Sequence, residues 1–211
     1  MYNGMKRWLF KQFQNNFIYY FIITILFVLG IAIGSITIKI LDMEQKDRII
    51  MFLNSFFKSI EGNTFENISI LKQSIIDNFK TIVFIWITGT IVIGLVVIPI
   101  IILFRGFAMG FTVGFLVNEY GIKGLFFCIL GIFPHNLLII PSIISIASMG
   151  MALSIKKFRR KDLRIGSKTF QSNAINYSIS VLFFSIFVLI GCLVEAYISP
   201  TFLRLLHSNL N

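Results

Sequence analysis

The sequence predicts an all-α integral membrane protein: a polytopic helix bundle of about five spans, with the N-terminus inside, the C-terminus outside and one proline-broken helix. Three observations support this prediction. Of the 211 residues, 56% are hydrophobic and only 13% are charged, whereas a soluble globular chain carries about 25% charged residues. Long stretches without Asp, Glu, Lys or Arg recur along the chain, and basic residues gather between them.

This composition excludes a soluble enzyme and a disordered chain. The length fits a single membrane domain over residues 1–211. The net charge is +10. In a chain this apolar, an excess of basic residues usually lies in cytoplasmic loops. We therefore expect membrane lipid around the protein and no nucleic-acid partner. Cys128 and Cys192 lie in apolar stretches and fit no metal motif, which predicts two buried thiols.

Five uncharged stretches predict helices near residues 17–38, 81–104, 106–119, 124–155 and 174–198. About 20 apolar residues cross roughly 30 Å of hydrocarbon. The stretch 106–118 has 13 residues, or about 20 Å of helix, so it crosses only with help from flanking residues. The stretch 124–155 is too long for one straight span, and we expect a break near Pro134 and Pro141.

The orientation follows from the positions of Lys and Arg. The loop 156–168 is strongly basic, and such loops stay in the cytoplasm; its basic residues are Lys156, Lys157, Arg159, Arg160, Lys161, Arg164 and Lys168. Four crossings then connect an inside N-terminus to this loop, and Arg105 is expected in a cytoplasmic turn between two spans. The basic run is interpreted as a topology signal, with a lipid-binding, membrane-shaping role as the alternative.

The loop 39–80 is expected outside the cytoplasm. Two runs of apolar residues at helical spacing, Ile49 to Ile60 and Ile68 to Phe79, predict two amphipathic helices in it. Such helices lie on the outer leaflet or pack on the spans. The alternative is a docking surface for a partner outside the cytoplasm.

Catalytic motifs are missing from the sequence. The two histidines, His135 and His207, form no His-Glu-x-x-His motif. No Asp lies in a predicted span, and neither Gly-x-Ser-x-Gly nor a P-loop occurs. We therefore expect no enzymatic activity, no catalytic residues, no cofactor and no metal.

Small residues mark the predicted span 106–119. Gly106, Gly110 and Gly114 repeat every four residues, and Gly30 and Gly34 repeat the pattern once on the first span. A bare helix face permits the close contact by which helices associate in lipid. We interpret these faces as packing within this bundle; the alternative is packing against a span of another protein.

The segment Pro134-His135-Asn136, followed by Pro141, places polar groups at membrane depth. Each proline removes a backbone donor, and the side chains of His135 and Asn136 can satisfy the carbonyls that this leaves free, with Asn118 or Ser142 as further partners. Polar groups at this depth also suggest function. A discontinuous helix forms the substrate site of many transporters, so a small permease or channel is the alternative function.

The order of these motifs resembles the stage II sporulation protein M family. The resemblance rests on Arg105-Gly106-Phe-Ala-Met-Gly110-Phe-Thr-Val-Gly114, then Gly121-Ile-Lys-Gly124, then Pro134-His135-Asn136 and Pro141. It is strongest over about residues 100–155.

The resemblance implies a role in endospore formation in Gram-positive bacteria. Members of this family belong to a cell-membrane complex with the stage II sporulation proteins D and P, two peptidoglycan hydrolases. The family member is the multi-pass component, thought to recruit or position the hydrolases while the mother-cell membrane engulfs the forespore. The resemblance therefore implies a non-enzymatic membrane scaffold in the mother-cell engulfing membrane.

Overall fold

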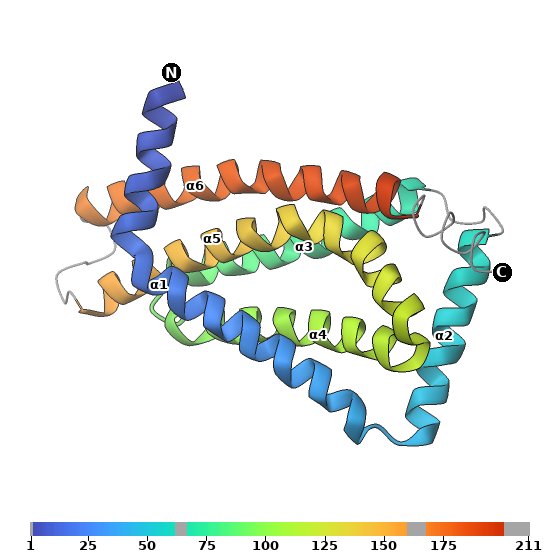
Figure 1. The fold of residues 1–211 in the computed structure, drawn as a ribbon. Helices are drawn as coiled ribbons and strands as arrows, with labels where there is room; N and C mark the ends of the chain where they lie inside the picture. Colours follow the sequence, from blue (N-terminus) through green and yellow to red (C-terminus); the bar gives the residue numbers. More distant parts are fainter. Residues whose placement is uncertain (1, 62–66, 160–167, 201–211) are drawn as a thin grey trace.

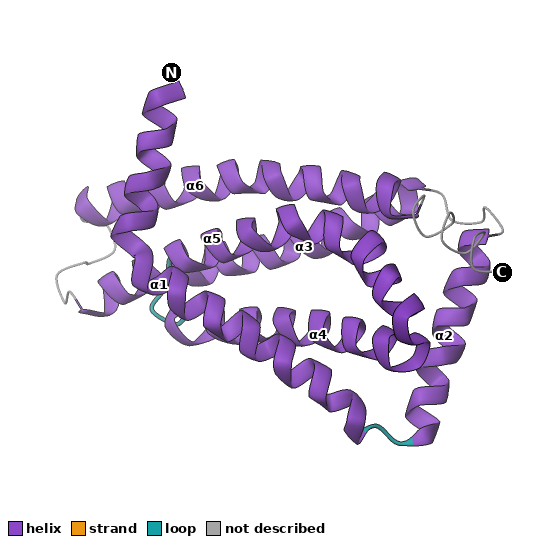
Figure 2. Ribbon diagram, in the orientation of Figure 1, coloured by secondary structure: helices purple, strands orange, loops and turns teal. Residues whose placement is uncertain are grey.

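The structure is a computed structural model that describes residues 2–61, 67–159 and 168–200. These residues are helical apart from short turns, and they contain no strand (Figure 2). The prediction of an all-α protein is confirmed. The elements are α1 (Tyr2–Thr37), η1 (Ile38–Ile40), α2 (Met43–Glu61), α3 (Asn67–Gly89), α4 (Gly94–Phe127), η2 (Cys128–Ile132), α5 (Phe133–Arg159), α6 (Lys168–Leu193) and η3 (Val194–Ile198).

Three helical stretches are long and apolar enough to cross a membrane: Asn16–Ile40, Gly94–Arg159 and Gln171–Ile198. The second has 66 residues, about 100 Å of straight helix, and it cannot run straight through roughly 30 Å of hydrocarbon. It changes direction at Gly121, which has φ 56° and ψ −130°. Five crossings, an inside N-terminus and an outside C-terminus stay predictions.

The helices α1 and α4 lie against each other (Figure 1). Glycines on both helices bring the two backbones into close contact. A Cβ atom on Gly106 would meet the backbone oxygen of Phe27, and one on Gly110 would meet that of Ile31. On α1, a Cβ on Gly34 would meet the backbone of Phe107. The missing side chains therefore let the two backbones touch, as close packing in lipid requires.

The helices α1, α3, α4 and α6 pack around α5. One end of this bundle is filled tightly. Tyr177 of α6 is 3% exposed, and its hydroxyl donates to the backbone oxygen of Ile85 at 3.2 Å. Gly89 and Gly150 both pack against the Tyr177 ring. Ile98, Ile102, Ile143 and Ile146, each at most 1% exposed, belong to the same core.

The predicted boundary between the helices 81–104 and 106–119 is wrong. The chain reverses earlier, in a tight turn over Thr90–Ile93, and α4 then runs without interruption through Arg105. The residues of the turn carry no charge. Ser154 Oγ lies within hydrogen-bond distance of the backbone oxygens of Gly89 and Ile91, at 3.0 and 2.9 Å. Arg105 therefore lies inside a candidate span and not in a cytoplasmic turn.

Of the two helices predicted in the segment 39–80, only the first is a separate helix. The first amphipathic run forms α2, as predicted, and Figure 1 shows α2 across one end of the bundle. The second run does not form a separate loop helix, because it is the first half of α3 and continues to Gly89. Its inner face carries the buried Ser74 and Asn78, which bind polar groups of other helices.

A π-helical turn, η2, lies directly before α5, and the predicted break of 124–155 near its prolines stays a prediction. In this turn the N–H of Phe133 bonds to the oxygen of Cys128, five residues earlier. Pro134 then lies in the first turn of α5, where a proline interferes least with helical hydrogen bonds. Pro141 lies inside α5, and the helix continues through it.

Candidate membrane-embedded polar site

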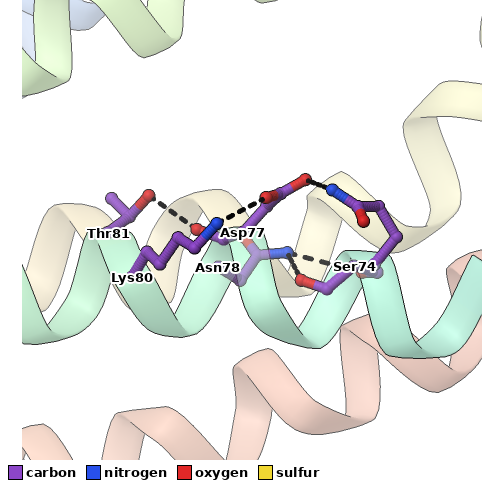
Figure 3. Close-up of polar contacts among 6 residues, drawn as sticks. Ser74, Asp77, Asn78, Lys80 and Thr81 are labelled. Atoms are coloured by element: carbon purple, nitrogen blue, oxygen red, sulfur yellow. Dashed lines mark hydrogen bonds and ion pairs between the residues drawn. The ribbon is translucent and has the colours of Figure 1, made fainter.

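A chain of polar side chains joins α3, α4 and η3 inside the bundle. The guanidinium of Arg105 donates to the side-chain oxygen of Asn78. The amide nitrogen of Asn78 donates to the backbone oxygen of Ser74 at 3.0 Å, a contact that Figure 3 shows along α3. The Ser74 hydroxyl donates to Glu195 Oε2 at 2.6 Å. Cys192 of α6 completes the set, with its sulfur 3.6 Å from the Asn78 nitrogen.

This chain ends in opposite charges, Arg105 and Glu195, and both lie within candidate spans. The two groups interact electrostatically, but they form no direct ion pair. An isolated charge in hydrocarbon is unfavourable. Here each charge is stabilised by a hydrogen bond to a buried residue of α3 and by the opposite charge nearby.

A second polar cluster lies at the start of α5. The Asn136 amide nitrogen donates to the backbone oxygen of Ile132 at 2.9 Å and lies 3.0 Å from His135 Nε2. With the Asn136 amide in this orientation, Nε2 accepts a hydrogen bond, so the imidazole proton is on Nδ1. That atom lies 3.2 Å from the hydroxyl of Ser199. His135 and Asn136 thus connect the start of α5 to the segment after η3.

The prediction that Asn118 or Ser142 bonds to His135 and Asn136 is wrong. Asn118 instead bonds to the neighbouring Glu119 at 2.8 Å. The Ser142 hydroxyl donates to the backbone oxygen of Leu138 at 2.7 Å, within its own helix. The bond to Ser199 comes from a segment 64 residues away in sequence, a distance that no local pattern reveals.

Both polar clusters open into one cavity of about 590 Å³. Arg105, Glu195, His135, Asn136 and Ser199 contribute its polar wall, and apolar side chains supply most of the rest. The main apolar contributors are Phe27, Met109, Leu116, Phe127, Ile132 and Ile140. This volume lies within the range of roughly 300–1,000 Å³ that small-molecule sites have.

The glycines singled out in the sequence lie at close contacts. Gly106, Gly110 and Gly114 face α1, where Gly114 packs near Ser35 and Ile38. The Ser35 hydroxyl donates to the Gly110 oxygen at 3.1 Å. Gly124 packs instead on the backbone of Leu116, across the reversal at Gly121.

The described residues of the basic run lie at the end of the bundle opposite α2 (Figure 1). Lys156, Lys157 and Arg159 form the last turn of α5. The Lys157 ammonium donates to the backbone oxygen of Thr90 at 3.1 Å, so the end of α5 and the α3–α4 turn lie together. Lys168 begins α6. Arg160, Lys161 and Arg164 lie outside the described residues.

Sequence reasoning placed Arg105 in a turn and did not connect Arg105 with Glu195 through Ser74 and Asn78. One signal was present, because Arg105 stands between two uncharged stretches, 81–104 and 106–118. Such an isolated arginine fits a single long span with a buried charge as well as a turn. Cys128 and Cys192 are free and buried, as predicted. Across the described ranges, no group of three or more His, Cys, Asp or Glu residues is placed to hold a metal ion.

Apolar helices of membrane-spanning length around a buried charged network define a helical integral membrane protein. The chain belongs to the stage II sporulation protein M family, whose model matches residues 23–200. The predicted resemblance to this family is thereby confirmed, and the chain is a sporulation-related membrane protein of a family not known as an enzyme family. No significant match to a curated protein or to a solved structure was found.

Proposed function

We propose that this protein is a non-enzymatic, multi-pass scaffold of the endospore engulfment complex in the mother-cell engulfing membrane. It recruits or positions the peptidoglycan hydrolases, the stage II sporulation proteins D and P. Family membership supports the setting, and the absence of a catalytic motif in the sequence supports the lack of chemistry.

One structural observation carries this proposal: α3 has a charged face that points away from the bundle. Asp77 and Lys80 lie 4.0 Å apart, with 58% and 73% of their side chains exposed. Gln73 donates to the same Asp77 carboxylate at 2.8 Å. Figure 3 shows Asp77 and Lys80 beside Asn78, the residue that contacts Cys192 and Arg105 inside two candidate spans.

The depth of this face matters because charges are unfavourable against lipid tails. Asp77 is next in sequence to Asn78, and Asn78 contacts Arg105 of α4 and Cys192 of α6, both within candidate spans. A partner helix with polar side chains would cover the face and replace lipid there. Polar contacts of this kind hold membrane helices together, which suits a protein that positions other proteins.

The test is co-purification of both hydrolases with this protein from sporulating cells. We expect the double variant Asp77→Leu, Lys80→Leu to lose the hydrolases while the protein stays in the membrane. The matched control is Glu44→Leu, Arg48→Leu, which removes an equally exposed pair from α2. If the α3 variant retains both hydrolases as well as the wild type does, this surface is not the docking site. If the wild-type protein retains neither hydrolase, the scaffold proposal fails.

A small permease or channel is the second candidate function, and the cavity at His135 favours it. Transport requires a path that continues to the other end of the bundle, where Tyr177, Gly150 and Ile98 pack closely. Solute flux into proteoliposomes that disappears in His135→Ala would support this function. Flux that is identical in the variant and the wild type would count against it.

A further inference from the structure

The cavity offers two opposite charges with unused hydrogen-bonding capacity. A guanidinium has five N–H donors, and Arg105 makes one hydrogen bond, to Asn78. A carboxylate accepts several bonds, and Glu195 accepts one, from Ser74 at 2.6 Å. Neither residue has a buried, unsatisfied side-chain atom. The remaining donors and acceptors therefore face the cavity that both residues line.

The separation of the two charges decides which ligand fits. Their atoms are too far apart for a direct ion pair, and together they have no net charge. A purely anionic group at Arg105 would also approach the Glu195 carboxylate, which repels it. A group with a negative and a positive part places its oxygens at Arg105 and its N–H donors at Glu195, so it satisfies both charges.

The rest of the cavity wall is apolar and fits a ligand with an apolar tail. Phe27, Met109 and Phe127 line the cavity beside the charged residues. The cavity occupies the half of the bundle that contains the start of α3 and the end of α4, since Ile70, Leu116 and Pro200 also line it.

The cavity is closed in the direction of the basic end of the bundle. On η2 and α5 its wall includes residues between Gly131 and Ile140, and further along α5 Ile143, Ile146, Ala147 and Gly150 are buried. Ser154 then bonds to the α3–α4 turn. A cavity that is closed at one end has the shape of a binding site and not of a continuous pore.

We propose that this cavity binds a zwitterionic amphiphile, namely a phospholipid whose head group joins a phosphate to a primary ammonium. Arg105 binds the phosphate, Glu195 binds the ammonium, and the apolar wall holds part of an acyl chain. Guanidinium–phosphate and ammonium–carboxylate pairs are the charge-assisted bonds that such a head group makes best. The inference does not depend on the scaffold proposal, because it concerns a different surface.

The test is lipid binding by the purified, delipidated full-length protein, titrated with three lipids of equal chain length. Phosphatidylethanolamine has an ammonium with N–H donors, phosphatidylcholine has a positive charge without them, and phosphatidylglycerol has no positive charge. We expect phosphatidylethanolamine to bind about tenfold tighter than either other lipid, as one additional charge-assisted hydrogen bond allows. Equal affinity for all three, or tighter binding of phosphatidylglycerol, would overturn the proposal.

The variant Glu195→Gln assigns the preference to this cavity. It keeps the shape of the side chain and an acceptor for Ser74 but removes the charge, so we expect the tenfold preference for phosphatidylethanolamine to disappear. The control Tyr177→Phe removes a buried hydrogen bond outside the cavity and should keep the preference. Both variants are compared at equal folded fraction, measured by gel filtration in detergent. A preference that survives Glu195→Gln would show that the lipid binds elsewhere and would overturn the assignment.

Discussion

The guanidinium of Arg105, in the middle of α4, donates a hydrogen bond to the side-chain oxygen of Asn78 on α3. This bond joins a charged residue of one candidate span to a polar residue on the inner face of its neighbour. Through Ser74 it continues to Glu195 of η3, which directly follows α6. Three helices are thus held in register by one polar chain in an otherwise apolar bundle.

Asn78→Ala should destabilise the bundle through Arg105. A hydrogen bond between neutral groups of membrane helices contributes about 0.6 kcal/mol on average, but one to a charged group contributes about 1.5–3 kcal/mol. We expect Asn78→Ala to lower the free energy of unfolding in mixed micelles by about 2 kcal/mol.

The control for this prediction is Ser178→Ala, which removes the neutral acceptor of Trp86 Nε1, bonded at 3.0 Å between α3 and α6. We expect it to lower the free energy of unfolding by about 0.6 kcal/mol. Equal effects of the two substitutions would mean that the Arg105 charge does not depend on Asn78.

Gly110→Leu should separate α1 from α4. A Cβ at Gly110 already meets the backbone of Ile31, and neither backbone can move without disturbing the rest of the contact. Overpacking of this kind costs about 1–3 kcal/mol, sometimes more, so we expect a lower thermal midpoint in detergent. Phe104→Leu, on an exposed part of α4, is the control and should leave the midpoint nearly unchanged. A stable Gly110→Leu bundle would show that α1 is held by other contacts.

The helical class was predictable because a membrane leaves few alternatives for a chain with 56% hydrophobic residues. The glycine pattern was also informative, since it identifies two bare faces, and Gly30 and Gly34 of α1 do pack on the α4 backbone, at Gly106 and at Phe107. What the pattern left open was whether those faces meet each other or another protein, because spacing describes one helix at a time.

The position of the turn before α4 was not predictable from charge. Uncharged stretches locate helix ends only where loops carry charge, and the residues of the turn Thr90–Ile93 carry none. Arg105 was consequently placed in a loop. The same limit hid the Ser74–Glu195 bond, which joins residues 121 positions apart. Buried polar partners depend on tertiary packing, and a single sequence does not record them.

Gly121→Ala tests the reversal between α4 and the segment that leads into α5. No atom lies within 4 Å of a Cβ at this position, so the effect is one of backbone conformation alone. Side-chain-bearing residues avoid φ 56° with ψ −130°, and holding one there costs about 1–3 kcal/mol. We expect a loss of stability in this range for Ala and no rescue by Asn, which tolerates the left-handed helical region but not this ψ.

A comparison with Gly124→Ala separates conformation from crowding. Gly124 has no unusual φ, but its Cβ would meet the backbone of Leu116. We expect Gly124→Ala to be destabilised as well, in this case by crowding against the backbone of Leu116. Unchanged unfolding of Gly121→Ala in mixed micelles would show that the reversal does not need glycine.

The contact between Lys157 and Thr90 makes a prediction about topology. Because the Lys157 ammonium bonds to the Thr90 oxygen at 3.1 Å, the α3–α4 turn and the basic loop 156–168 must face the same side of the membrane. We propose that this side is the cytoplasm, since basic loops are retained there. Single cysteines at Ile91 and at Lys156 should therefore react with a membrane-impermeant maleimide only after the cells are permeabilised.

A cysteine at Lys46, near the start of α2, should react in intact cells, because α2 lies at the opposite end of the bundle. The native thiols Cys128 and Cys192 are buried and should contribute little background. Labelling of Ile91→Cys and Lys156→Cys from opposite sides would contradict the fold itself. Labelling of both in intact cells would preserve the fold and reverse its orientation, which would place the lipid cavity in the half of the bundle nearer the cytoplasm.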